Sequence, residues 1–231
     1  WYCCKQLSSF IMDKFNTSFS VEQRIIHRLF LETPFIPSIG LLTGQMGVSL
    51  AFFAHSRHTN NAIYEDFAIE LLDDILNLLN NSIDNTFNNG LAGIGWGIEY
   101  LLNNGFVVGY GVEICEEIDR KIMEIDPKRI TDLSLDYGLE GLLHYVLFHI
   151  SASIQQNTII PFDKFYLEDL YTTLVQTRQK TIPDSLRSLS KIYIDFIESG
   201  KEICYPFDLT SFKKTNVFSV ERLNAYPLGI K

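Results

Sequence analysis

Apolar residues recur every three to four positions along most of the chain, which is the period of an amphipathic helix. Residues 61–80 are the clearest case, because acidic residues separate an apolar stripe made of Ile63, Phe67, Leu71 and Ile75. The same pattern predicts three further helices, at residues 112–125, about 163–179 and 183–198. Each has one apolar and one polar face, so we expect these four helices to lie at the periphery of an all-α protein. Residues 203–231 are less regular and predict a loop with a short helix.

A second kind of helix alternates with the first, apolar on nearly all sides and with two glycines at its start. It occurs three times, in Gly44-Gln45-Met46-Gly47-Val48, Gly90-Leu91-Ala92-Gly93-Ile94 and Gly138-Leu139-Glu140-Gly141-Leu142. The first glycines are 46 and then 48 residues apart, a period typical of helical-hairpin repeats. A helix that is apolar all round must be enclosed, and glycines three residues apart let backbones approach closely. The alternative is a solenoid of ordinary hairpins in which the glycines serve only tight turns.

These three segments resemble the repeat of the lanthionine synthetase C-like family, most closely in Asn89-Gly90-Leu91-Ala92-Gly93-Ile94-Gly95-Trp96-Gly97-Ile98. The resemblance covers roughly residues 38–150 and, more weakly, the rest of the chain. It implies an (α/α) toroid-type array of helical hairpins in one domain over residues 1–231, with inner helices starting near 44, 90 and 138. The complete family fold has more hairpins than the roughly four predicted here. We therefore expect an array that is incomplete relative to the full family barrel, either a shortened relative or part of a longer chain.

The resemblance also implies where a metal would bind. Enzymatic members hold zinc at the mouth of the inner ring through two cysteines and a histidine, and two of these ligands form a Cys-His pair immediately before a Gly-x-x-Gly helix. The zinc makes a cysteine thiolate of the substrate peptide nucleophilic, and the thiolate adds to a dehydrated serine or threonine to close a thioether ring. The corresponding pairs here are Leu42-Thr43, Asn88-Asn89 and Asp136-Tyr137, which offer neither a thiolate nor an imidazole. We expect no metal site and no cofactor, and the pattern favours a protein without catalysis.

Polar residues at the mouth of the predicted toroid are the candidate ligand-binding residues: Thr43, Asn88, Asn89, Glu99, Asp136, Tyr137, Glu140 and His144. Glu99 stands among apolar neighbours on the second enclosed helix, so its carboxylate must face either a cavity or a partner. On the third enclosed helix, Glu140 and His144 lie one turn apart, and the imidazole faces either the central cavity or the core. The asparagines suit either a polar rim that binds a peptide backbone or helix caps and turns.

Composition narrows the range of partners. The 231 residues are 46% apolar and 20% charged, which is typical of a globular protein. A net charge of −9 argues against nucleic acid or an anionic membrane surface as partner, and no apolar run is long enough to span a bilayer. The cysteines show neither zinc spacing nor a disulfide framework, which favours a reducing, cytoplasmic location; they are Cys3, Cys4, Cys115 and Cys204. We expect a peptide or protein partner, and the pattern predicts no particular oligomeric state.

Four functions fit these patterns. The first is a zinc-free lanthionine synthetase C-like protein that binds a peptide as an accessory in peptide modification or export. The second is a zinc-dependent thioether cyclase whose metal-binding repeats are absent from this chain. The third is a helical interaction scaffold with a filled centre. The fourth, a six-hairpin glycosidase-like enzyme, requires carboxylates among Glu99, Asp136 and Glu140 to face one another across a sugar. The repeat motif together with the missing ligands favours the first.

Overall fold

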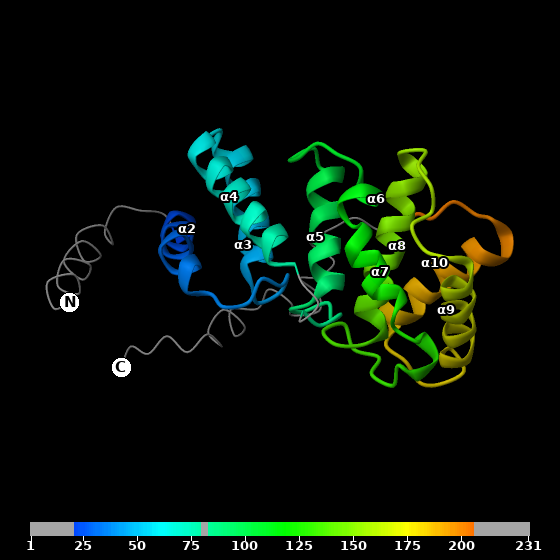
Figure 1. Cartoon of the computed structure of the whole chain (residues 1–231). Helices are drawn as coiled ribbons and strands as arrows, with labels where there is room; N and C mark the ends of the chain where they lie inside the picture. Colours follow the sequence, from blue (N-terminus) through cyan, green and yellow to red (C-terminus); the bar gives the residue numbers. More distant parts are fainter. Residues whose placement is uncertain (1–20, 80–82, 206–231) are drawn as a thin grey trace, which may run out of the picture. The chain divides into compact units, whose positions relative to one another are not determined.

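The computed structural model describes residues 21–79 and 83–205, and the regular elements in this part of the chain are all helices (Figure 1). The all-α fold class predicted from the apolar period is therefore confirmed. The chain divides into two compact units, residues 1–37 and residues 38–231. In the first, helix α2 (Val21–Glu32) is followed by the short 3-10 helix η1 (Thr33–Phe35), which contains a proline in its first turn.

The second unit is built from helical hairpins. Its elements are α3 (Gln45–Thr59), α4 (Ala62–Leu78), α5 (Leu91–Asn103), α6 (Gly111–Ile114), α7 (Glu116–Met123), η2 (Pro127–Arg129), α8 (Leu139–Gln155), α9 (Lys164–Thr177) and α10 (Asp184–Ser199). Residues 206–231, which carry most of the predicted C-terminal loop and short helix, lie outside the described part of the chain. None of the described helices is long and apolar enough to cross a lipid bilayer.

The three glycine-led segments form the enclosed helices α3, α5 and α8. Each helix begins directly after the first glycine of its motif, and almost every residue of α5 and α8 is buried. Helix α3 contacts α5, α5 contacts α8, and α8 contacts α10, so these helices form a continuous series (Figure 1). The amphipathic α4 packs along α3 and buries only one stripe, made of Ala68, Leu71, Leu72 and Ile75.

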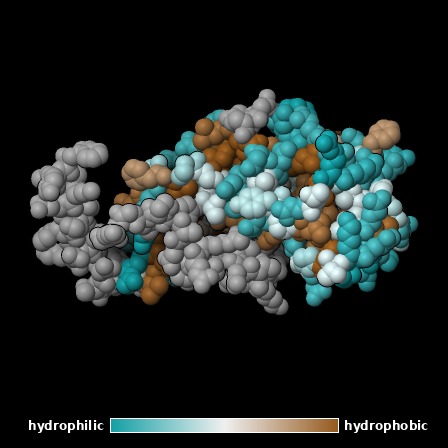
Figure 2. Space-filling view, turned by 90° about the horizontal axis from the view of Figure 1, so that it is seen from below, coloured by the Kyte–Doolittle hydropathy of each residue, from teal (hydrophilic) through white to brown (hydrophobic). Residues whose placement is uncertain are grey.

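Two details of the peripheral helices differ from the predicted pattern. The helix predicted over residues 112–125 is interrupted at Cys115, so it forms two helices, α6 and α7. The side chain of Cys115 is completely buried. Helix α10 packs on α8 as well as on α9, and it is preceded by Pro183 as its N-cap. On the face shown in Figure 2, both hydrophilic and hydrophobic residues reach the surface.

Candidate functional site

The loops that precede the three enclosed helices share one construction. In each, a side-chain oxygen accepts a hydrogen bond from the backbone N–H two residues later, which is the geometry of a polar turn. The three bonds are Gly40 N to Ser38 Oγ at 3.2 Å, Thr86 N to Asp84 Oδ1 at 2.9 Å and Ser134 N to Asp132 Oδ1 at 2.7 Å. The carbonyl of the same residue then accepts the first N–H of the following helix, from Gln45, Leu91 and Leu139. The turn therefore sets where each enclosed helix begins.

Successive loops are joined directly to one another. The N–H of Leu42 donates to the carbonyl of Asn88 at 2.9 Å, and the N–H of Asn88 donates to the carbonyl of Asp136 at 3.0 Å. Residues that stand immediately before the three Gly-x-x-Gly motifs thus lie side by side, although they are almost fifty positions apart in the chain.

The second glycine of each motif lets its helix pack closely on the loop that precedes it, and at Gly141 also on Phe87 of the neighbouring loop. A Cβ on Gly93 would overlap the carbonyl of Phe87, and a Cβ on Gly141 would overlap both the carbonyl of Leu135 and the side chain of Phe87. Both glycines lie inside helices, so their role is backbone packing and not turn formation. A side chain at either position would push the helix away from the loop before it.

Five of the predicted ligand-binding residues come together in these loops, and we call them the rim: Thr43, Asn88, Asn89, Asp136 and Tyr137. The Thr43 hydroxyl donates to the carboxamide oxygen of Asn89 and lies 3.2 Å from Oδ1 of Asn88. The Asn88 amide donates to the phenol oxygen of Tyr137 at 3.1 Å. Asn88 is buried, whereas Tyr137 is 59% exposed. The rim is therefore a connected set of amides and hydroxyls that reaches solvent.

The structure does not bring the other three predicted residues to the rim. Glu140 is buried in the first turn of α8, where burial raises the pKa of its carboxyl and a hydrogen bond from Ser185 partly offsets this. Nδ1 of His144 lies 2.6 Å from the Tyr205 hydroxyl, which also accepts a hydrogen bond from the Trp96 indole at 3.0 Å. The side chain of His144 keeps some contact with solvent, yet loss of hydration lowers its pKa to about 3, so the imidazole is neutral.

Glu99 forms part of a separate buried cluster. One ring nitrogen of His149 lies 2.5 Å from Oε1 of Glu99, and the other lies 2.9 Å from Oδ2 of Asp119. Tyr145 donates to the second oxygen of Asp119 at 2.6 Å, and Asn103 donates to the second oxygen of Glu99 at 3.2 Å. The three ionisable groups come from α5, α7 and α8, and we call Glu99, Asp119 and His149 the ionic cluster.

The two carboxylates decide the charge of the imidazole. Burial by itself lowers the pKa of His149, but the hydrogen bonds and charges of Asp119 and Glu99 raise it to about 9. His149 is therefore positively charged at neutral pH and donates from both ring nitrogens. Burial raises the pKa of the nearby Cys115 thiol, and the charges of Glu99 and Asp119 raise it further, so this thiol is no nucleophile. The ionic cluster joins three helices and is closed to solvent, which suits a structural role.

The residues present do not fit the zinc that the family resemblance implies. In residues 21–79 and 83–205, no three His, Cys, Asp or Glu side chains converge as metal ligands. Glu99 and Asp119 hold opposite sides of one imidazole, so they share no point at which a metal ion could sit. The rim offers amides, hydroxyls and one carboxylate, which are not the thiolate and imidazole ligands that zinc prefers.

The partnership within the ionic cluster was not predicted from the sequence. Glu99 was expected to face a cavity or a partner, and the partner is His149, fifty positions later. Asp119 was not singled out at all. The available signal was that a few charged side chains stand among the apolar positions of α5, α7 and α8, because buried charges must find one another.

Comparison with known proteins agrees with this architecture. The model of the family described as lanthionine synthetase C-like protein matches residues 37–192, which is more than half of the chain and includes all three enclosed helices and the rim. Searches of curated proteins and of solved structures gave no match. With the repeat, the enclosed helices and the family match in agreement, the chain belongs to the lanthionine synthetase C-like family.

Proposed function

We propose that this protein is a zinc-free member of its family that binds a peptide at the rim and acts as an accessory in peptide modification or export. The observation that carries the proposal is the rim itself. Three loops from three repeats meet there through backbone hydrogen bonds, and their side chains present amides and hydroxyls next to an exposed tyrosine.

The chemistry of the rim suits an uncharged polar chain. A peptide backbone offers alternating N–H donors and carbonyl acceptors, and carboxamides and hydroxyls can pair with both. Tyr137 adds a ring that can cover an apolar side chain of the peptide while its hydroxyl stays bonded to Asn88. Asp136 is the one carboxylate of the rim, and it is half-buried.

The position of the rim supports the same proposal. By resemblance, cyclases carry their Cys-His pair immediately before a Gly-x-x-Gly helix, and Thr43, Asn89 and Tyr137 occupy that position here. Replacing a thiolate and an imidazole by hydroxyl and amide groups removes the means of activating a cysteine thiol. It leaves hydrogen-bonding groups that can hold a peptide without reacting with it.

Peptide binding can be tested by fluorescence anisotropy with a fluorescein-labelled linear peptide that contains serine, threonine and cysteine. We expect saturable binding to the full chain, weakened about tenfold by Tyr137→Ala, because interface tyrosines commonly contribute this much. Tyr110→Ala is the matched control, since Tyr110 is also exposed but precedes α6, outside the rim. Equal affinity in the two variants, or no binding by the unaltered chain, would contradict binding at the rim.

The metal part of the proposal has its own test. Elemental mass spectrometry of the purified protein should find zinc far below one equivalent. Stoichiometric zinc that survives dialysis would overturn a zinc-free function and favour the cyclase alternative, whatever the outcome of the peptide experiment.

A further inference from the structure

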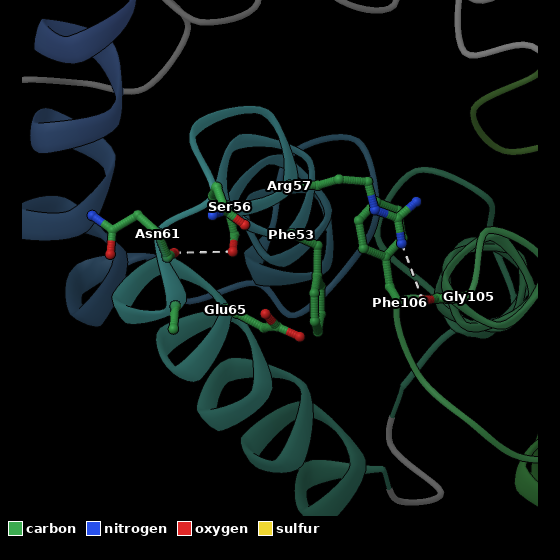
Figure 3. A pocket seen from close by; sticks show the side chains of 9 residues that line it. Phe53, Ser56, Arg57, Asn61, Glu65, Gly105 and Phe106 are labelled. Carbon is green, nitrogen blue, oxygen red and sulfur yellow. Dashed lines mark hydrogen bonds between the residues drawn. The ribbon is translucent and has the colours of Figure 1, made fainter.

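A second site lies away from the rim, in a cleft between the end of α3, the start of α4 and the loop after α5. Its volume is about 300 Å³, at the lower end of the range for small-molecule pockets. Its lining includes Phe53, Ser56, Arg57, Asn61, Glu65 and Phe106 (Figure 3). At the helical rise per residue, Arg57 lies about 18 Å along α3 from Gln45, where the rim end of the helix begins.

Arg57 is exposed and reaches across the cleft to the loop after α5. Nη2 donates to the carbonyl of Gly105 at 3.1 Å, and the guanidinium carbon lies 3.5 Å from the centre of the Phe106 ring. Figure 3 shows the side chain extended over that ring. A guanidinium has five N–H groups in one plane, so a single bond to Gly105 leaves several for an anion.

Glu65 brings the opposite charge to the same cleft. It belongs to the first turn of α4, and Figure 3 shows its carboxylate directed into the space beside Phe53. The ion pairs found among the described residues include neither Arg57 nor Glu65. The cleft therefore presents a positive and a negative side chain that do not neutralise each other by direct contact.

The rest of the wall combines two aromatic rings with polar groups of the turn between α3 and α4. The rings of Phe53 and Phe106 lie 5.5 Å apart, and Phe53 is fully buried. Across the turn, the Ser56 hydroxyl donates to the carbonyl of Asn61 at 3.0 Å, and the Asn61 N–H donates to the carbonyl of Ser56. A preformed wall reduces the entropy lost when a ligand binds.

We propose that this cleft binds a small zwitterion of amino-acid size. Its carboxylate pairs with Arg57, its ammonium group pairs with Glu65, and its side chain lies against Phe106, whose side chain is half-buried. Both charged side chains are exposed, and a zwitterion fits because it offers each of them an opposite charge and adds no net charge to the cleft. This site shares no residue with the rim, so the test of ligand binding in the cleft is independent of the test of peptide binding at the rim.

Three ligands that share the phenylalanine side chain test the proposal on the unaltered full chain by calorimetry. L-phenylalanine carries both charges, N-acetyl-L-phenylalanine only the carboxylate, and L-phenylalaninamide only the ammonium group. We expect phenylalanine to bind at least about tenfold more tightly than either blocked form, because each loses one charge-assisted contact. Equal affinities for the three ligands, or no binding of phenylalanine in the millimolar range, would overturn the proposal.

Two substitutions then test which side chain pairs with which charged group of the ligand. Arg57→Gln should abolish the preference for phenylalanine over phenylalaninamide, and Glu65→Gln should abolish the preference over N-acetylphenylalanine. Glu70→Gln is the control, because Glu70 is exposed on the same helix but does not line the cleft. Retention of both preferences in both variants would overturn the assignment. The comparison of ligands on the unaltered chain remains decisive should either variant fold poorly.

Discussion

The rim and the ionic cluster both join successive repeats, yet they do so in opposite ways. The rim uses backbone groups and uncharged side chains at equivalent positions of three loops, and part of it is exposed. The ionic cluster uses three charged side chains at non-equivalent positions of α5, α7 and α8, all buried. Equivalent contacts can form between any two neighbouring repeats, whereas the ionic cluster can form in one place only. We infer that the rim sets how repeats stack and that the ionic cluster sets which helices meet.

His149→Ala should have the largest effect on stability, since it leaves the buried carboxylates of Glu99 and Asp119 without their shared cation. We expect a loss of about 3–5 kcal/mol in the free energy of unfolding, the usual cost of an uncompensated buried charge. Urea denaturation followed by circular dichroism at pH 7 measures it. The control is His58→Ala, because His58 is exposed at the end of α3. A loss below about 1 kcal/mol would show that the ionic cluster contributes little.

The pH dependence of stability tests the contribution of the ionic cluster in the unaltered protein. The folded pKa of His149 is raised from 6.5 to about 9, so its contribution is fully present below pH 6.5 and is lost as the pH rises through 9. The shift corresponds to about 3 kcal/mol. Unfolding curves at pH 6.5, 8 and 9.5 should show this decline, and His149→Asn should remove most of it. A decline of equal size in His149→Asn would assign the effect to other groups.

Gly141→Ala tests the rim side of the comparison. The new Cβ would overlap the Leu135 carbonyl and the Phe87 side chain, so α8 must move away both from the loop before it and from the neighbouring loop. We expect a loss of about 2–3 kcal/mol, typical of overpacking a close contact. Gly109→Ala should change stability by less than about 0.5 kcal/mol, because the nearest atom there is the end of the flexible Ile114 side chain. Similar losses in both variants would argue against a special role of the motif glycine.

The smallest effects come from removing one phenol hydroxyl from each region. Tyr145→Phe deletes a buried hydrogen bond to the Asp119 carboxylate and should cost about 2 kcal/mol. Tyr137→Phe deletes a partly exposed bond from Asn88 and should cost less than about 0.5 kcal/mol. Both substitutions remove one phenol hydroxyl, so the two losses in the free energy of unfolding, measured by urea denaturation, compare the ionic cluster directly with the rim. Equal losses would mean that burial does not distinguish them.

The parts of the structure that repeat could be predicted from the sequence. The apolar period and the Gly-x-x-Gly register located α3, α5 and α8, because both signals are local and recur every 46 to 48 residues. The same register brought together the rim residues Thr43, Asn88, Asn89, Asp136 and Tyr137, which occupy equivalent positions in neighbouring loops.

The parts that do not repeat could not be predicted. Glu99 and His149 meet across fifty residues with no shared period, and the interruption at Cys115 that precedes Asp119 has no local breaker such as proline. The cleft at Arg57 depends on the path of the loop at Gly105 and Phe106, which no periodic pattern describes. Side-chain pairing between distant segments depends on tertiary packing, and a single sequence does not encode it in any readable spacing.

The hydrogen bonds between loops run in one direction, from Leu42 to Asn88 and from Asn88 to Asp136. The middle loop thus offers a carbonyl to the loop before it and an N–H to the loop after it. In evolutionary terms, a gene that encodes such repeats can gain or lose a whole repeat by duplication or deletion. The loops that then become neighbours still offer one another a backbone N–H and a carbonyl. A family built this way can vary its number of hairpins while the joint between them stays the same.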